Sequence, residues 1–127
     1  MKNLLAHLVG DYVLQTHYEA VEKTTRSGPA FTHAAKYTAA FLPITRNPKA
    51  LLVIGGTHYL IDRYRLAKYV NWGKNQLAPE EFRPDSVDNG GYPASTPSGL
   101  ATALLFITDN TMHLLINEWA INKWSNK

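Results

Sequence analysis

Prolines and glycines divide this chain into four stretches of helical periodicity, and this division constrains the fold more than any other feature of the sequence. Apolar side chains recur every three or four residues within each stretch, and none shows the strict alternation of a β-strand. The fold class is therefore predicted to be all-α, a compact four-helix arrangement in a single helical domain, 1–127. The predicted helices are Asn3–Lys23, Pro29–Phe41, Pro48–Trp72 and Pro97–Trp124.

The segment Asn75–Pro97 differs from the rest of the chain because it is rich in proline and contains the adjacent glycines Gly90 and Gly91. We expect a long Pro/Gly-rich loop between the third and fourth helices, with one short helical turn at Pro79–Phe82. A loop of this length in a small domain is typical of a lid or a binding loop. Tyr92 follows the two glycines, and we expect its ring to contact a ligand.

Composition excludes several classes of protein. The chain has no cysteine, so zinc–thiolate sites, iron–sulfur clusters, disulfide scaffolds and cysteine nucleophiles are ruled out. A hydrophobic fraction of 45% with 18% charged residues is typical of a globular protein and not of a disordered one. The net charge of +3 is a mild excess that suits a small phosphorylated molecule, and it does not predict binding to extended nucleic acid.

Two apolar segments were candidates for targeting or membrane insertion. The first, Leu4–Gly10, is similar to the core of a signal peptide, but His7 and Asp11 break the apolar run and no small-residue cleavage site follows. The second, Leu100–Ile121, carries three ionisable side chains that are costly in lipid. We therefore expect a soluble, cytoplasmic protein with no targeting segment and no stable membrane insertion.

Histidine and aspartate occur four residues apart three times, and this pattern points most directly to chemistry. A spacing of four places two side chains on one face of a helix, one turn apart. His33 has no such partner, but it gives every predicted helix one imidazole. The residues of this set are His7, Asp11, His33, His58, Asp62, Asp109 and His113.

Imidazole and carboxylate groups bind Zn, Mn or Fe in sites that activate water, and helix bundles build such sites from inward-facing side chains. We predict that all seven residues are ligands of a divalent metal, and the set is large enough for two ions bridged by a carboxylate. Asp11, Asp62 and Asp109 are also predicted to be catalytic, because an aspartate not fully used in coordination can accept a proton from the attacking water.

Basic side chains near the second His–Asp pair are suited to phosphate. Arg63 and Arg65 follow Asp62 in the sequence, and we predict that both bind the substrate together with Lys36. Lys23 could contribute in the same way. Each of these residues could equally belong to an ordinary solvated helix face.

A structural interpretation competes with the metal site. Any single His–Asp pair can be a surface salt bridge or a buried hydrogen-bonded pair that holds two helices together. Gly55 and Gly56, just before His58, allow either tight helix packing or the approach of a ligand. His17 lies in a polar stretch and is interpreted as a surface residue.

Four motifs occur in order along the chain: His7-Leu-Val-Gly-Asp11-Tyr-Val-Leu-Gln15, the isolated His33, Thr57-His58-Tyr-Leu-Ile-Asp62-Arg63, and Asp109-Asn-Thr-Met-His113. On these motifs the chain resembles the domain-of-unknown-function family 3307, whose members occur in bacteria and in tailed phages. The resemblance covers the chain apart from the loop at 75–97. It implies a bacterial or phage protein, and because the family has no established activity it implies no reaction.

Together these features predict a metal-dependent hydrolase of a phosphoester, a phosphodiesterase acting on a nucleotide or cyclic nucleotide signal in the cytoplasm, or the host cytoplasm if a phage encodes it. Two alternatives remain open. A nucleotide-binding module would sequester the same ligand without catalysis, and it would need no metal. A small membrane-associated structural protein would depend on detergent during purification. A homo-oligomer is compatible with all three.

Overall fold

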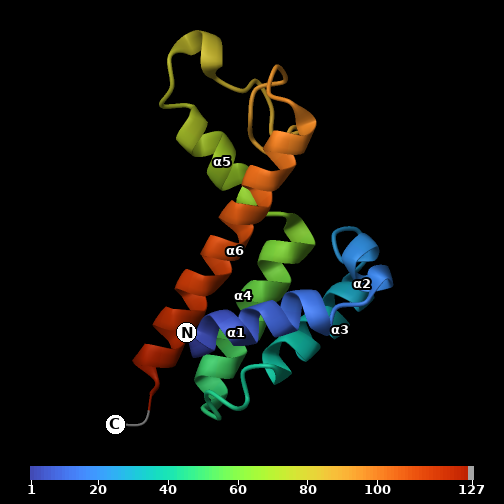
Figure 1. Ribbon diagram of the computed structural model, residues 1–127, viewed down its shortest axis with the longest axis vertical. Coiled ribbons are helices and arrows are strands. Elements are labelled where there is room, and N and C mark those ends of the chain that lie inside the picture. Colours follow the sequence, from blue (N-terminus) through green and yellow to red (C-terminus); the bar gives the residue numbers. More distant parts are fainter. Residues whose placement is uncertain (126–127) are drawn as a thin grey trace. The chain divides into compact units, whose positions relative to one another are not determined.

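Helices make up the regular structure of the protein, as a computed structural model that describes residues 1–125 shows (Figure 1). No strand occurs within the described residues, so the predicted all-α class is confirmed. Two of the helical segments are not α-helices: η1 is a π-helix and η2 is a 3-10 helix. The elements are α1 (Lys2–Leu8), η1 (Val9–Val13), α2 (His17–Glu22), α3 (Ser27–Ala39), α4 (Pro48–Tyr64), α5 (Ala67–Asn75), η2 (Glu80–Phe82) and α6 (Ser98–Lys123).

The chain forms two compact units. The first unit comprises residues 1–64 and 113–127, and the second comprises residues 65–112. The boundary falls within α6, so this helix contributes its C-terminal part to the first unit and its N-terminal part to the second. The single domain expected from the sequence stays a prediction.

The first predicted helix is interrupted, and the expectation of one continuous helix over residues 3–23 is wrong. After α1 the backbone widens into η1, and the helix ends before Thr16. The Thr16 hydroxyl accepts a hydrogen bond from the Glu19 backbone, and the Glu19 carboxylate accepts one from the Thr16 backbone in return. This capping box starts α2 as a separate helix. Its Thr-x-x-Glu signature was present in the sequence.

The third predicted helix is also divided. It begins as expected, because the Asn47 side chain accepts a hydrogen bond from the Lys49 backbone N–H at 2.9 Å and Pro48 occupies the first helical position. It ends at Tyr64, because Arg65 adopts a left-handed conformation with φ of 50°. A new helix, α5, then begins at Ala67. No proline or glycine marks this break in the sequence.

The core of the first unit lies where α1, α3, α4 and the end of α6 meet. Its buried apolar members are Ala6, Tyr37, Phe41, Ile54 and Ala120. Of the helix pairs in the described residues, α3 and α4 make the most extensive contact. Gly55 of α4 makes this contact close, since a Cβ atom there would collide with the Thr38 hydroxyl of α3. Gly56 faces open space.

The Pro/Gly-rich loop belongs to the second unit and is held against α5. Gly90 and Gly91 both have positive φ, and the Gly91 backbone lies so close to α5 that a side chain would collide with the Lys68 carbonyl. The Asn71 amide donates to the Gly90 carbonyl at 3.0 Å, and the Asn75 amide donates to the Gly91 carbonyl at 2.9 Å. The two glycines therefore fix the loop locally, and the short helical turn expected near residues 79–82 is present as η2.

One helix in the described part of the chain, α6, is long and apolar enough to cross a membrane by length and composition. Of its most apolar 18-residue window, 17% is buried. The buried side chains of this helix include the polar His113 and Asn117.

Candidate metal centre

Six of the seven predicted ligands lie in the first unit, and all six are buried. They reach the interior from five different elements, so the sequence pairs are brought together by tertiary packing. The residues are His7 on α1, Asp11 on η1, His33 on α3, His58 and Asp62 on α4, and His113 on α6. The seventh, Asp109, precedes His113 by one turn of α6 and belongs to the second unit.

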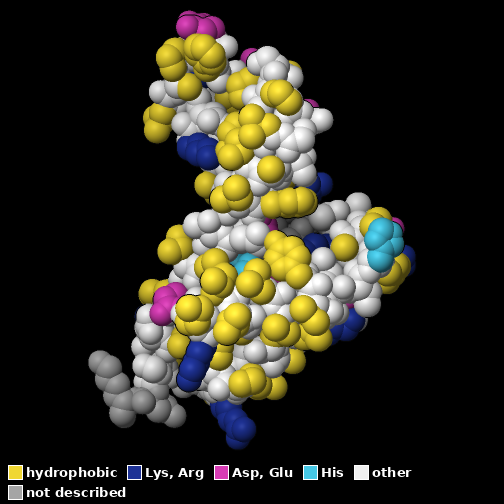
Figure 2. Space-filling model, in the orientation of Figure 1, with side chains coloured by type: hydrophobic (Ala, Val, Ile, Leu, Met, Phe, Trp, Pro, Cys, Tyr) yellow, Lys and Arg dark blue, Asp and Glu magenta, His cyan; other side chains and the backbone are white. Residues whose placement is uncertain are grey.

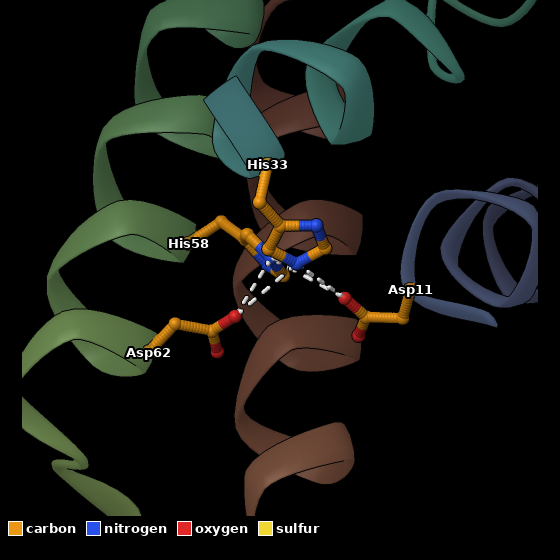
Figure 3. A group of neighbouring side chains, drawn as sticks. All are labelled: Asp11, His33, His58 and Asp62. Carbon is orange, nitrogen blue, oxygen red and sulfur yellow. Dashed lines mark hydrogen bonds and ion pairs between the residues drawn. The ribbon is translucent and has the colours of Figure 1, made fainter. Parts of the chain in front are cut away.

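Four of these side chains converge on one point (Figure 3). The ligand atoms of Asp11, His33, His58 and Asp62 all lie within 4.8 Å of one another. The Nε2 atom of His33 is 3.1 Å from Asp11 Oδ1 and 3.3 Å from Asp62 Oδ2. The Nε2 atom of His58 is 3.3 Å from the same Asp11 oxygen and 3.2 Å from the same Asp62 oxygen. The two Nε2 atoms are 2.9 Å apart.

The four distances between a nitrogen and an oxygen, 3.1–3.3 Å, are close to the edges of a coordination tetrahedron, and the distance between the two nitrogens, 2.9 Å, is shorter. Ligands about 2.0–2.1 Å from Zn²⁺ in tetrahedral geometry lie about 3.3–3.4 Å from one another. Ordinary hydrogen bonding accounts for the contacts less well, because an imidazole nitrogen offers one proton or one lone pair. The His33 Nε2 atom lies close to one atom each of Asp11, His58 and Asp62, but it can form a full hydrogen bond with one of these three atoms. The structure therefore contains a buried Asp/His group that could hold a metal ion.

The electrostatics keep both carboxylates ionised. Burial alone would raise the pKa of Asp11, but hydrogen bonds from His33 and His58 outweigh it and hold that pKa well below its usual range. Burial would also raise the pKa of Asp62, and the charge of His58 with hydrogen bonds from His113 and His33 lowers it well below the usual value. Two buried negative charges require cations close by.

The pKa of His33 is raised, whereas the pKa values of Asp11 and Asp62 are lowered. Burial would lower the pKa of its imidazole, but hydrogen bonds to Asp11 and Asp62 raise the pKa above the ordinary value. The Nδ1 atoms of His33 and His58 are buried and have no hydrogen-bond partner. Each of the two rings therefore directs its Nε2 atom at the carboxylates of Asp11 and Asp62.

His7 and His113 contact the second oxygens of the two carboxylates. His113 Nε2 lies 3.1 Å from Asp62 Oδ1, and His7 Nε2 lies 3.5 Å from Asp11 Oδ2. Each aspartate therefore has one oxygen at the convergence point and the other against a histidine. His7 and His113 therefore contact the four-residue group through its carboxylates, and their predicted role as metal ligands stays a prediction.

Two residues that the sequence analysis missed support this shell. The Tyr37 hydroxyl is 2.7 Å from His7 Nδ1, and the Asn117 amide donates to the same hydroxyl at 2.6 Å. The Tyr37 ring also stacks on His58, with centroids 3.6 Å apart and an interplanar angle of 11°. Tyr37 follows His33 by four residues, and Asn117 follows His113 by four residues. The same helical spacing could therefore have suggested both.

Lys23 is a cation in contact with the convergence point. Its Nζ atom donates to Asp62 Oδ2 at 2.6 Å and lies 3.5 Å from His33 Nε2. The side chain is 17% exposed, compared with 4% for Asp62. Lys23 is therefore partly accessible from the protein surface while it contacts the buried Asp62 carboxylate.

The other predicted phosphate ligands have different surroundings. Lys36 pairs with Glu19 at 2.9 Å, and the Arg63 guanidinium donates to the Thr24 carbonyl at 2.8 Å. Arg65 is exposed in the second unit, next to the break after α4. Tyr92 is half-buried in that unit, where its ring lies 5.2 Å from Lys74 Nζ. Their roles in substrate binding stay predictions.

Comparison with known proteins identifies the family. A family model described as a protein of unknown function, DUF3307, matches residues 1–119 of the chain. The chain therefore belongs to this family, as the four motifs indicated. No curated protein and no solved structure matches the chain.

Proposed function

We propose that this protein is a divalent-metal-dependent phosphoesterase with a nucleotide-like substrate. The observation that carries the proposal is the convergence of two imidazole nitrogens and two carboxylate oxygens, 2.9–3.3 Å apart across five contacts, on one buried point. Nitrogen and oxygen donors in this number favour Zn²⁺, Mn²⁺ or Fe²⁺. A metal ion held there would polarise a phosphoryl oxygen and lower the pKa of bound water.

The residues of the chain supply the proton chemistry. In the hydrolysis of a phosphoester, the oxygen of water bonds to phosphorus while the bond from phosphorus to the ester oxygen breaks. One proton leaves the water, and the departing alkoxide takes up a proton. Asp62 and His113, in contact at 3.1 Å, form a pair that can accept the first proton and return one to the leaving group.

Lys23 is the residue we expect to hold the substrate phosphate. Its ammonium group already neutralises an anionic oxygen at 2.6 Å, and it is the more exposed partner of that pair. A phosphate approaching from the surface meets this ammonium group before it meets the carboxylates. Lys36 pairs instead with Glu19, which is not one of the four converging residues, so it is less suited to the same role.

Metal content and hydrolysis test the proposal together. Protein purified without chelator should contain at least one equivalent of Zn, Mn or Fe by elemental analysis. It should hydrolyse bis(p-nitrophenyl) phosphate or a member of a panel of nucleotides and cyclic nucleotides. Chelator should abolish the activity and lower the melting temperature, because a metal that binds only the folded state stabilises it.

The alternatives predict different results. A sequestering module would bind a nucleotide with full affinity in the presence of chelator and would release no product. Buried His–Asp pairs with a purely structural role would leave the protein free of metal at every purification. Either result would overturn the proposed activity.

A further inference from the structure

The outer face of α1 and η1 is apolar where a helix on a protein surface is ordinarily polar. Leu5, Tyr12 and Val13 are 55%, 61% and 72% exposed. On the inner face of the same segment His7 and Asp11 are buried in the candidate metal centre. The amphipathic pattern of this segment is thus reversed, with polar groups inside and large apolar groups outside.

The neighbouring part of α6 repeats this reversal. Leu115 and Trp119 are 67% and 52% exposed, whereas His113 and Asn117 are buried. The two helices are adjacent, because the Asn3 amide of α1 donates to the backbone carbonyl of Leu114 at 3.1 Å. Figure 2 shows hydrophobic side chains spread over the region that α1 occupies in Figure 1. We refer to the exposed apolar residues of α1, η1 and this part of α6 as the apolar face. They are Leu4, Leu5, Leu8, Val9, Tyr12, Val13, Leu115 and Trp119.

Positive charge accompanies the apolar face. The residues of the first unit include nine Lys and Arg and five Asp and Glu, a net charge of +4, whereas the second unit has four basic and five acidic residues. Three of the five acidic residues of the first unit, Asp11, Glu19 and Asp62, are buried. Lys2, at the start of α1, is exposed. Beside the apolar face on α6, Lys123 places its Nζ atom 4.8 Å from the Trp119 ring, and Glu118 is an exposed acidic residue next to it.

We propose that the apolar face docks on the surface of a lipid bilayer that contains anionic headgroups. Large apolar side chains of such a segment enter the boundary between headgroups and acyl chains, and cations at its edge pair with lipid phosphates. The 7 residues of α1 and the 5 of η1 span about 18 Å, against about 30 Å for a hydrocarbon core, so this segment lies in the plane of the interface. The contact is peripheral and does not require stable insertion.

Charge argues for a bilayer over a second copy of the chain. A symmetric dimer through the apolar face would bring together two units that each carry a net charge of +4. An anionic lipid surface satisfies the leucines and the cations at the same time. The proposal does not depend on the proposed hydrolase activity, because no residue of the apolar face belongs to the metal centre.

Vesicle flotation with the full chain tests the proposal. Wild-type protein should float with vesicles of phosphatidylglycerol and phosphatidylcholine, and more weakly with phosphatidylcholine alone. A Leu5→Gln, Val13→Gln double variant should bind the anionic vesicles at least about tenfold more weakly. Leu77→Gln is the matched control, because Leu77 is 89% exposed but lies in the second unit, and it should bind like wild type.

A second variant tests the electrostatic part of the proposal without changing the packing of any apolar side chain. Lys2→Gln leaves every apolar side chain in place and should weaken binding to anionic vesicles about fivefold, with no effect on neutral ones. Both results should be the same in chelator. Failure of the wild type to float, or an equal loss in Leu77→Gln and the double variant, would overturn the proposal. A dimer in sedimentation that the double variant abolishes, without vesicle binding, would assign the face to a second copy instead.

Discussion

The Nε2 atoms of His33 and His58 lie 2.9 Å apart, and each lies within 3.3 Å of an oxygen of Asp11 and an oxygen of Asp62. Two imidazoles can share one hydrogen bond, but they cannot also donate to two carboxylates from the same pair of atoms. A divalent cation would satisfy all four groups at once.

Replacement of Lys23 by methionine should separate metal binding from phosphate binding. The ammonium group competes with a metal for Asp62 Oδ2, so Lys23→Met should bind the metal about tenfold more tightly, given the repulsion expected between charges a few ångströms apart. The same variant should lose affinity for inorganic phosphate or nucleotide. Isothermal titration of Zn²⁺ and then of phosphate measures both effects.

Lys36→Met is the matched control for this experiment, because Lys36 is a lysine of the same unit whose partner is Glu19. It should leave both affinities within twofold of wild type, as expected for a group outside the centre. Unchanged phosphate affinity in Lys23→Met, or an equal loss in both variants, would contradict the role of Lys23 as the phosphate-binding cation.

Glu19 should make the stability of the first unit depend on acid pH. Burial would raise the pKa of Glu19, but hydrogen bonds from Thr16 and Lys36 outweigh it and lower the pKa from 4.5 to about 2. A carboxylate with a lowered pKa stabilises the folded state at pH values above its unfolded pKa. That contribution is lost as the pH falls from about 4.5 to about 2.

Glu19→Gln should therefore cost about 1–3 kcal/mol at neutral pH and nothing measurable near pH 2. Urea unfolding of wild type and variant over this range measures the difference. Glu22→Gln is the control, because Glu22 pairs with Arg26 at 4.0 Å on the surface, and it should change stability by less than about 0.5 kcal/mol. A Glu19→Gln effect that does not vary with pH would contradict the ionic role of Glu19.

The adjacent glycines of α4 should respond in opposite ways to the same substitution. Gly55→Ala places a methyl group against the Thr38 hydroxyl and should destabilise the protein by about 1–3 kcal/mol. Gly56→Ala meets open space and should be neutral or stabilise by up to about 1 kcal/mol, since alanine favours a helix more than glycine does. Thermal unfolding distinguishes the two. Equal effects would contradict the close packing of α3 on α4.

Helical periodicity and capping signals predicted the all-α class and the start of α4 at Pro48, because both depend on local sequence. The breaks before α2 and after α4 were not predicted. The first had a local signal in Thr16 and Glu19, which the continuous periodicity of the segment obscured. The second has none, because Arg65 adopts φ of 50° without the glycine that such a conformation favours.

The candidate site was predictable in part for the same reason. A spacing of four predicted that His58 and Asp62 share a face of α4, and they do. The approach of Asp11 and His33 to that face depends on contacts between helices, which a single sequence does not encode in any local pattern. The support of His7 by Tyr37 and Asn117 is likewise tertiary, since residues 7, 37 and 117 meet only after folding.

Elemental analysis of three proteins tests the central claim most directly: wild type, His58→Ala and His17→Ala, each purified without chelator. His17 is an exposed histidine on α2 and serves as the control. We expect at least one equivalent of Zn, Mn or Fe in wild type and in His17→Ala. In His58→Ala the metal should be largely lost while the helical circular dichroism is retained, because the variant removes one of four ligands. Wild-type protein that contains no metal, or His58→Ala that folds and retains the full equivalent, would contradict the metal centre.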